Sequence, residues 1–149
     1  MTAGEYCNRE VIRIEPKVSI TEAASLMREY HVGTLVVVER EESITRPIGI
    51  ITDRDLVIEV IAQQVPLDEV TVNDLINKEL VSVTEQETLL NSIALMQRKG
   101  VRRMIVVDDY GSLQGIISAD DVIELIAEAM HKLCNIVRRE IANEQSMHP

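Results

Sequence analysis

Two short polar motifs with the same spacing are the residues of this 149-residue sequence best suited to chemistry. Thr52 is followed three residues later by Asp55, and Ser118 is followed at the same spacing by Asp121. A hydroxyl and a carboxylate in this pattern suit the first turn of a helix, where free backbone N–H groups attract an anion such as a phosphate. A carboxylate can also accept two hydrogen bonds from the neighbouring hydroxyls of a ribose. The motifs therefore indicate a nucleotide site, or two helix caps with a purely structural role.

Each motif follows a Gly-Ile-Ile tripeptide, which places Gly49 and Gly115 at equivalent points. A glycine has no side chain to block the close approach of a ligand. The duplication favours a binding cleft over two independent caps, although a cap and a ligand contact can coexist.

The motifs occur twice because the sequence repeats itself. Ser19–Glu39 aligns without gaps on Thr88–Asp108, and Ile48–Ala62 aligns on Gln114–Glu128. The chain is therefore interpreted as two homologous halves.

Each half has the hydrophobic pattern of a β-α-β-β-α unit. Ser19 and Thr88 are expected to cap the first helix of each half, and Ser19 with Glu22 matches a capping box. The expected elements are first strands at Val11–Ile14 and Leu80–Val83, unbroken apolar strands at Leu35–Val38 and Met104–Val107, connecting loops at Arg40–Pro47 and Asp109–Ser112, and returning strands at Ile48–Ile51 and Leu113–Ile117. The unbroken strands are rich in β-branched residues, which predicts burial on both faces.

The predicted fold class is α/β (α+β), with two β-α-β-β-α repeats packed with pseudo-two-fold symmetry and clefts between them. A half of about 60 residues is near the lower limit for a core of its own, so the halves are expected to pair. The expected domains are the first repeat at 1–64, a connector at 65–77, the second repeat at 78–130 and a helical extension at 131–149. The connector is expected to contain a short helix begun by Thr71 and Asp74.

The repeated segments GIITDRDL (Gly49–Leu56) and GIISADDV (Gly115–Val122), with the LVVVE and MIVVD strands, resemble a tandem cystathionine-beta-synthase-type (CBS) domain pair, or Bateman module. The resemblance covers nearly the whole chain, from about Cys7 to about Ala129. It implies a regulatory module that binds AMP, ADP, ATP, S-adenosylmethionine or NAD in clefts between the repeats. It also implies assembly as a disc-like dimer of pairs.

The resemblance further implies that Asp55 and Asp121 hold the ribose of the ligand. It assigns the adenine contacts to Ile12, Val32 and Gly33 in the first copy, and to Val81, Val101 and Arg102 in the second.

The residues themselves indicate where a phosphate would lie. Arg54 can reach it as a bidentate donor, whereas Asp120 at the equivalent position would repel it. Arg102 and Arg103 precede the second apolar strand, so a ligand held between the halves could take its cation from the other repeat. The hypothesis is that the two sites are unequal, the alternative being that these arginines are ordinary surface charges.

The charge balance limits the partners that we expect. The sequence has 25 Asp and Glu against 15 Lys and Arg, a formal net charge of -10, and no Phe or Trp. Nucleic acid is therefore not an expected partner, since nonspecific binding depends on basic side chains that neutralise phosphates. Any purine is expected to be held by aliphatic side chains and backbone.

The same sequence predicts a soluble, cytoplasmic protein that makes no contact with membranes. No segment approaches the roughly 20 apolar residues needed to cross a bilayer. The N-terminus lacks the pattern of a signal peptide. Cys7 and Cys134 lie near opposite ends of the sequence, which favours reduced thiols.

No residue set predicts an enzyme. His31, His131 and His148 lie in unrelated segments, and His131 with Cys134 would supply only two zinc ligands. The expectation is that no cofactor is required. Asp53 with Asp55, and Asp120 with Asp121, could hold Mg²⁺ through the phosphates of a nucleotide, although a role at the helix N-termini is the simpler interpretation.

The last helix is expected to be longer than its counterpart in the first repeat. An apolar stripe joins Val122, Ile126, Ala129, Leu133, Ile136 (or Val137) and Ile141. Beyond Met130 this stripe needs a partner, either a second subunit of a homodimer or the chain's own module. The leading function is an adenine-nucleotide sensor that acts in trans on a regulated protein not yet identified. The alternative is a structural or interaction dimer without a ligand.

Overall fold

The structure is a computed structural model that describes residues 1–76 and 79–148. The chain divides into two compact units, Met1–Ile117 and Ser118–Pro149. The predicted end of the connector at residue 77, the predicted start of the second repeat at 78 and the last residue, 149, fall outside the described residues.

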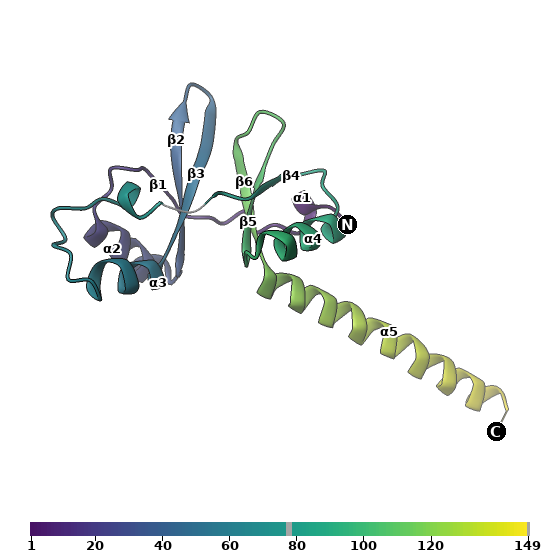
Figure 1. Ribbon diagram of the computed structural model, residues 1–149. Coiled ribbons are helices and arrows are strands. Elements are labelled where there is room, and N and C mark those ends of the chain that lie inside the picture. The colour runs from purple at the N-terminus through teal and green to yellow at the C-terminus, as the bar shows by residue number, and fades with distance from the viewer. Residues whose placement is uncertain (77–78, 149) are drawn as a thin grey trace. The chain divides into compact units, whose positions relative to one another are not determined.

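The described residues confirm the mixed α/β class, with two three-stranded sheets in the orders β1-β2-β3 and β4-β5-β6 (Figure 1). In each sheet the first strand runs parallel to the second. The elements of the first repeat are β1 (Arg13–Ile14), α2 (Ile20–Tyr30), β2 (Thr34–Glu41), β3 (Ile44–Thr52) and α3 (Asp53–Asp55), continued by a π-helical segment (Leu56–Ile61). The elements of the second are β4 (Ser82–Thr84), α4 (Leu89–Lys99), β5 (Arg103–Val107), β6 (Leu113–Ser118) and α5 (Ala119–Met147). Two short helices complete the elements of the described residues, α1 (Ala3–Tyr6) at the N-terminus and a 3-10 turn (Val72–Leu75) in the connector.

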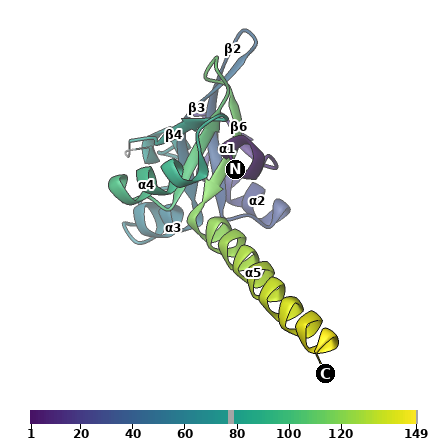
Figure 2. The same cartoon turned by 90° about the vertical axis from the view of Figure 1, so that its right-hand side faces the viewer.

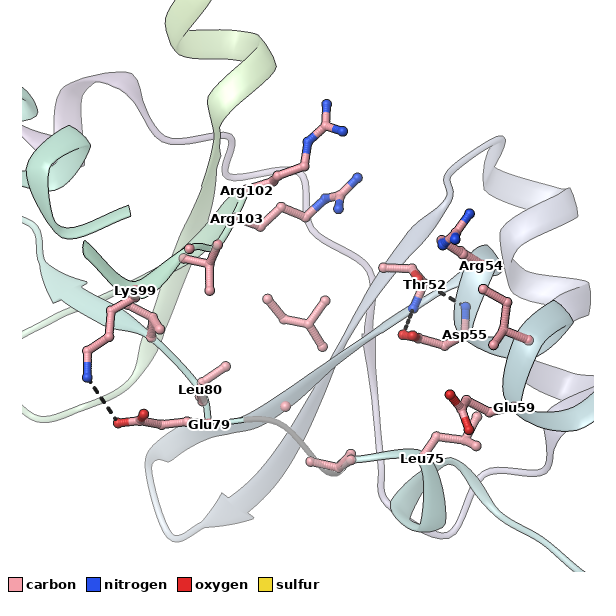
Figure 3. Close-up of a pocket in the computed structure, with 17 residues that line it drawn as sticks. Thr52, Arg54, Asp55, Glu59, Leu75, Glu79, Leu80, Lys99, Arg102 and Arg103 are labelled. Atoms are coloured by element: carbon pink, nitrogen blue, oxygen red, sulfur yellow. Dashed lines mark hydrogen bonds and ion pairs between the residues drawn. The ribbon is translucent and has the colours of Figure 1, made fainter. Parts of the chain in front are cut away.

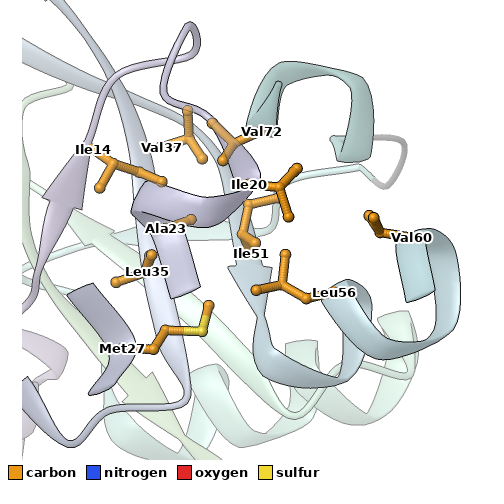
Figure 4. Close-up of a cluster of buried hydrophobic side chains, with 10 residues drawn as sticks. All are labelled: Ile14, Ile20, Ala23, Met27, Leu35, Val37, Ile51, Leu56, Val60 and Val72. Atoms are coloured by element: carbon orange, nitrogen blue, oxygen red, sulfur yellow. The ribbon is translucent and has the colours of Figure 1, made fainter. Parts of the chain in front are cut away.

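The alternating directions of the side chains in β2 explain its unbroken apolar sequence. Leu35 and Val37 belong to the core of the first repeat, together with Ala23 of α2 (Figure 4). Val36 and Val38 point to the opposite face, where they cluster with Ile105 and other residues of the second repeat. Both faces of the strand are therefore buried, as predicted, and the two sheets stabilise each other.

The helix starts follow the predicted caps. The hydroxyl of Ser19 accepts a hydrogen bond from the N–H of Glu22 at 3.1 Å, and that of Thr88 accepts one from Asn91 at 3.1 Å. In the connector, Thr71 and Asp74 form a reciprocal capping box at the start of the 3-10 turn. These bonds satisfy N–H groups that a helix leaves free at its first turn.

The predicted loop at Arg40–Pro47 is wrong, because most of this segment forms a long β-hairpin. β2 continues to Glu41 and β3 already begins at Ile44. Arg46 bonds to the carboxylates of Glu39 and Glu41, so the polar residues pair across the strands. Charged side chains on an exposed hairpin look like a loop in the sequence, although opposite charges across a strand pair stabilise it.

The first strand of each repeat is shorter than predicted. β1 begins at Arg13 rather than Val11, and β4 begins at Ser82 rather than Leu80. The preceding residues still take part in the sheets, because the carbonyl of Ile12 accepts from Val36 and that of Val81 accepts from Ile105, each at 3.0 Å.

An exchange of segments links the two repeats. The N-terminal segment packs on the second repeat, where Ala3 N–H donates to the carbonyl of Glu87 at 2.8 Å and Asn8 pairs with Ile116. The connector packs on the first repeat, since Thr71 pairs with Ser19 and Val72 lies in its core. Each repeat is thus completed by residues from outside its own β-α-β-β-α unit.

The second compact unit contains α5, a single unbroken helix that is visible along its whole length in Figure 2. The hydroxyl of Ser118 caps it and accepts from the N–H of Asp121 at 3.1 Å. Neither this helix nor any other within the described ranges is long and apolar enough to cross a membrane.

Candidate functional site

A cavity of about 670 Å³ lies within the first compact unit, between the two repeats (Figure 3). Its walls come from the end of β3 and the start of α3, from the connector and the residues before β4, and from the end of α4 and the start of β5. The lining residues are Gly49, Ile50, Thr52, Arg54, Asp55, Ile58, Glu59, Leu75, Ile76, Glu79, Leu80, Val81, Lys99, Gly100, Val101, Arg102 and Arg103.

Thr52 and Asp55 form a reciprocal capping box on one wall. Thr52 N–H donates to the Asp55 carboxylate at 2.9 Å, and Asp55 N–H donates to the Thr52 hydroxyl at 3.2 Å. The structural interpretation of this motif is therefore confirmed. The carboxylate has two oxygens with several lone pairs, so the box leaves it able to accept hydrogen bonds from a ligand as well.

Three arginines lie around the same cavity. Arg54 stands on the wall that carries Thr52 and Asp55, and Arg102 and Arg103 stand on the facing wall (Figure 3). The cations of the second repeat thus lie across the cavity from the polar motif of the first, as the sequence hypothesis requires. Guanidinium groups are suited to bidentate recognition of phosphate, so this end of the cavity favours an anionic group.

A fourth cation and two acids were not anticipated from the sequence. Lys99, the last residue of α4, forms an ion pair with Glu79 at 3.6 Å, and Glu59 also lines the cavity. Lys99 lies at the end of a helix, three residues before Arg102, and this spacing could have indicated that it lines the same cavity. Glu79 carried no such signal, because its place depends on the path of the connector.

The remaining walls are aliphatic. Val81 and Val101, which the sequence assigned to a site of the second copy, line this cavity beside Asp55 of the first copy, and Ile50, Ile58 and Leu80 add to the apolar surface. A flat base can bury its faces against such side chains without aromatic stacking. The gathered residues therefore combine an apolar slot, a carboxylate and a cluster of guanidinium groups.

Other predicted site residues do not line this cavity. The carbonyl of Gly33 accepts from Asp53 N–H at 2.9 Å, and Val32 N–H donates to Met27 in the turn that ends α2. Ile12 takes part in the sheet bond described above. Ser118 and Asp121 belong to the second compact unit, where they form the cap of α5.

Gly49 and Gly115 give room to the protein's own chain, which differs from the ligand-centred reason expected. A Cβ at Gly49 would lie 2.6 Å from Cγ2 of Ile76, and one at Gly115 would lie 2.6 Å from the carbonyl oxygen of Asn8. These are the two points where the exchanged segments cross the sheets. Each glycine is therefore needed for packing, and Gly49 also borders the cavity.

The arrangement suits binding. Within residues 1–76 and 79–148, no three His, Cys, Asp or Glu side chains come together as a metal site. His131 contacts the side chain of Asn135 at 3.4 Å, within α5. The cavity can thus bind an anionic, partly apolar ligand through the groups described above.

Comparisons with known proteins identify the repeats. A family model described as "CBS domain" matches residues 3–62 and 72–128. An uncharacterized protein from Methanopyrus kandleri is 38% identical over 125 residues, which is 84% of this chain but only 62% of that protein.

Solved structures show the same fold. A hexameric CBS-CP12 protein from bloom-forming cyanobacteria has a TM-score of 0.70 and 27% identity, covering 83% of this chain and 69% of that one. The CBS domain pair of protein MJ0100, solved in complex with 5′-methylthioadenosine and S-adenosyl-L-methionine, has a TM-score of 0.73. Its identity is 22%, over 87% of this chain and 98% of that one, so it bears on the fold alone.

Proposed function

Because this chain belongs to the CBS domain family, we propose that it is a regulatory module that binds an adenine nucleotide, AMP, ADP or ATP, in the cavity between its repeats. The observation that carries this proposal is the meeting of Arg54, Arg102 and Arg103 with the Thr52–Asp55 motif around an aliphatic cavity. Such a site offers each part of a nucleotide a chemically suited surface.

In the proposed complex the ribose hydroxyls donate to the carboxylate of Asp55, and the phosphates contact the arginines. The base packs against Val81 and Val101. A magnesium ion, where it accompanies ATP, would be held mainly by the phosphates. The proposed role is binding without turnover of the ligand.

The ligand would act by joining the two repeats. Asp55 belongs to the first repeat and Arg102 to the second, so a bound nucleotide stabilises those arrangements of the repeats that bring both walls to it. A partner protein that recognises this arrangement would be regulated in trans. A homodimer is the proposed assembly, and the hexameric relative shows that similar chains can assemble.

The competing function is a structural module without a ligand, which is favoured by the fully formed capping box at Thr52 and Asp55. S-adenosylmethionine and NAD are the alternative ligands. The sulfonium of S-adenosylmethionine is cationic, so the arginine-lined wall favours a phosphate-bearing ligand over it.

Thermal melting with AMP, ADP, ATP, S-adenosylmethionine and NAD tests the proposal. A ligand at about 100 times its Kd raises the free energy of unfolding by roughly 2.7 kcal/mol, which gives a clear rise in Tm. The variant Asp55→Asn keeps an acceptor for Thr52 N–H but loses the carboxylate, so we expect it to lose this rise.

Asp74→Asn is the matched control, because Thr71 and Asp74 form the same capping box and neither residue lines the cavity. It should cost similar stability and keep the ligand response. The proposal fails if no ligand raises the Tm, or if Asp55→Asn responds as strongly as the control.

A further inference from the structure

The long helix α5 carries an apolar stripe that is exposed to solvent. Its six members are Ile123, Ile126, Met130, Leu133, Val137 and Ile141, with 48% to 64% of their area exposed. The stripe differs from the expected one, because Val122 is buried and Ala129 lies to one side of it. At 100° per residue they fall within a sector of about 80° on a straight α-helix. A continuous apolar stripe of this length on a soluble helix indicates an interaction surface.

The opposite face of α5 is polar. Lys132 forms an ion pair with Glu128 at 3.5 Å, one turn apart, and both side chains are largely exposed. The contrast between the two faces shows which one requires a partner. It also indicates the shape of that partner, because a narrow, straight stripe fits another helix.

The charges along α5 are arranged in blocks. The charged residues of the first third are all acidic, Asp120, Asp121, Glu124 and Glu128, those of the middle are basic, Lys132, Arg138 and Arg139, and Glu140 and Glu144 follow in the last third. An antiparallel pair of α5 helices centred near Met130 places the acidic block of each copy at the same level along the axis as the basic block of the other copy. Most of these charges lie on the polar face, and Asp120 and Arg138 lie at the flank of the stripe. An in-register parallel pair instead places each block at the same level as the like-charged block of the other copy, which is repulsive.

We propose that α5 binds α5 of a second copy of this chain in an antiparallel helix pair centred on Met130. In this pair Ile126 of one copy packs against Leu133 of the other, and Ile123 packs against Val137. The helix dipoles then run in opposite directions, which is also favourable.

The flanks of the stripe support the same register. Asp120 and Arg138 are eighteen residues apart, which is five turns of an α-helix, so they lie on the same side of the stripe. In an antiparallel pair related by a two-fold axis, this side faces its equivalent in the other copy. Asp120 of one copy then approaches Arg138 of the other, and the contact occurs twice.

The oligomeric mass tests whether the stripe forms the interface. Leu133→Glu places a charge in the stripe, whereas Asn135→Glu places the same side chain on the polar face of the same turn. By light scattering after size exclusion, we expect the mass to halve for Leu133→Glu and to stay unchanged for Asn135→Glu. A monomeric wild type, or a Leu133→Glu variant with wild-type mass, overturns the proposal.

Disulfide cross-linking tests the orientation. Two single-cysteine chains, Ile123→Cys and Val137→Cys, are made in a Cys7→Ser, Cys134→Ser background, and one carries an affinity tag so that products differ in size. The antiparallel pair predicts a cross-link between the two variants when they are mixed and none for either alone. Cross-links of each variant with itself would show a parallel pair and overturn the proposed register.

Both tests are independent of the nucleotide proposal, since none of these residues lines the cavity. Circular dichroism of each variant checks that α5 remains helical.

Discussion

Among single residues, Cys7 has the environment that most affects its chemistry. Its thiol is half-buried where the N-terminal segment crosses β6, close to Gly115. Burial raises the pKa of Cys7 above its ordinary value, and Glu85 adds to this rise, while Arg9 opposes it. Arg9 and Glu85 also form an ion pair with each other at 2.8 Å.

The raised pKa predicts slow alkylation of Cys7 in the folded protein. Only the thiolate reacts, so a raised pKa reduces the reactive fraction at pH 8 and moves the rise in rate to higher pH. In a Cys134→Ser background, the rate of reaction with iodoacetamide should be several-fold lower for the native protein than for the protein in urea. An equal rate at pH 8 in both states would contradict this prediction.

The raised pKa of Cys7 also determines how the free energy of unfolding depends on pH. A thiol whose pKa is raised by folding favours the folded state while it is protonated, so this contribution is present below the pKa of the unfolded chain. It is lost as the pH rises through the pKa of the folded state.

Some residues of the candidate site could be predicted from a short stretch of sequence, and others could not. Thr52 and Asp55 could be predicted because a helix cap is a motif of four consecutive residues with a fixed spacing. Arg102 and Arg103 could be placed by alignment of the two halves. Glu79 could not, since its position depends on where the connector crosses the first repeat.

At the scale of elements, the ends of α2 and α4 show how the two repeats differ. Both helices end with a residue in the left-handed region, His31 with φ 54° and Gly100 with φ 65°. Glycine adopts this conformation readily, whereas other residues pay for a close contact with their Cβ. The aligned sequences predict the equivalence of these positions, but not that histidine would adopt the conformation.

Exchanging the two residue types should change stability in opposite directions. His31→Gly removes the Cβ strain and should raise the free energy of unfolding by up to about 1 kcal/mol. Gly100→Ala should lower it by about 1 kcal/mol, and a Cβ there would meet no atom within 4 Å, so backbone strain is the only cost. Urea denaturation without ligand measures both. A stabilised Gly100→Ala variant would contradict the argument.

The strands were predicted best where burial determined their sequence. The two apolar strands were found because both of their faces are covered, and a covered strand needs apolar residues throughout. The hairpin formed by the end of β2 and the start of β3 was not predicted, because it is exposed to solvent and many of its side chains, such as those of Arg46 and Glu39, are charged. Hydrophobic periodicity has no signal for such strands.

For the whole first unit, the exchange of segments is the feature that sequence reasoning did not reach. The pattern of apolar residues shows that each half needs a partner, and the cluster around Val36 and Ile105 is that contact. It does not show that residues before one repeat pack on the other. Such packing depends on backbone bonds between Asn8 and Ile116, which any sequence can make.

The N-terminal exchange leads to a prediction about coupled effects. Gly115→Ala would bring a Cβ within 2.6 Å of the carbonyl oxygen of Asn8, and a backbone atom held in a sheet bond cannot easily move away. Overpacking of this kind typically costs 1–3 kcal/mol. Gly49→Ala should cost less, because the atom it meets at 2.6 Å is the end of the Ile76 side chain.

Deletion of residues 1–8 removes the atoms that Gly115→Ala would strike. The deletion itself should destabilise the second repeat by about 2 kcal/mol or more, because several backbone hydrogen bonds are lost. On that shortened chain, however, Gly115→Ala should cost little further stability, while the cost of Gly49→Ala should remain. Urea denaturation of the six proteins, three full-length and three shortened, measures this coupling as a double-mutant cycle. Additive costs for Gly115→Ala and the deletion would show that the crossing segment is not what this glycine accommodates.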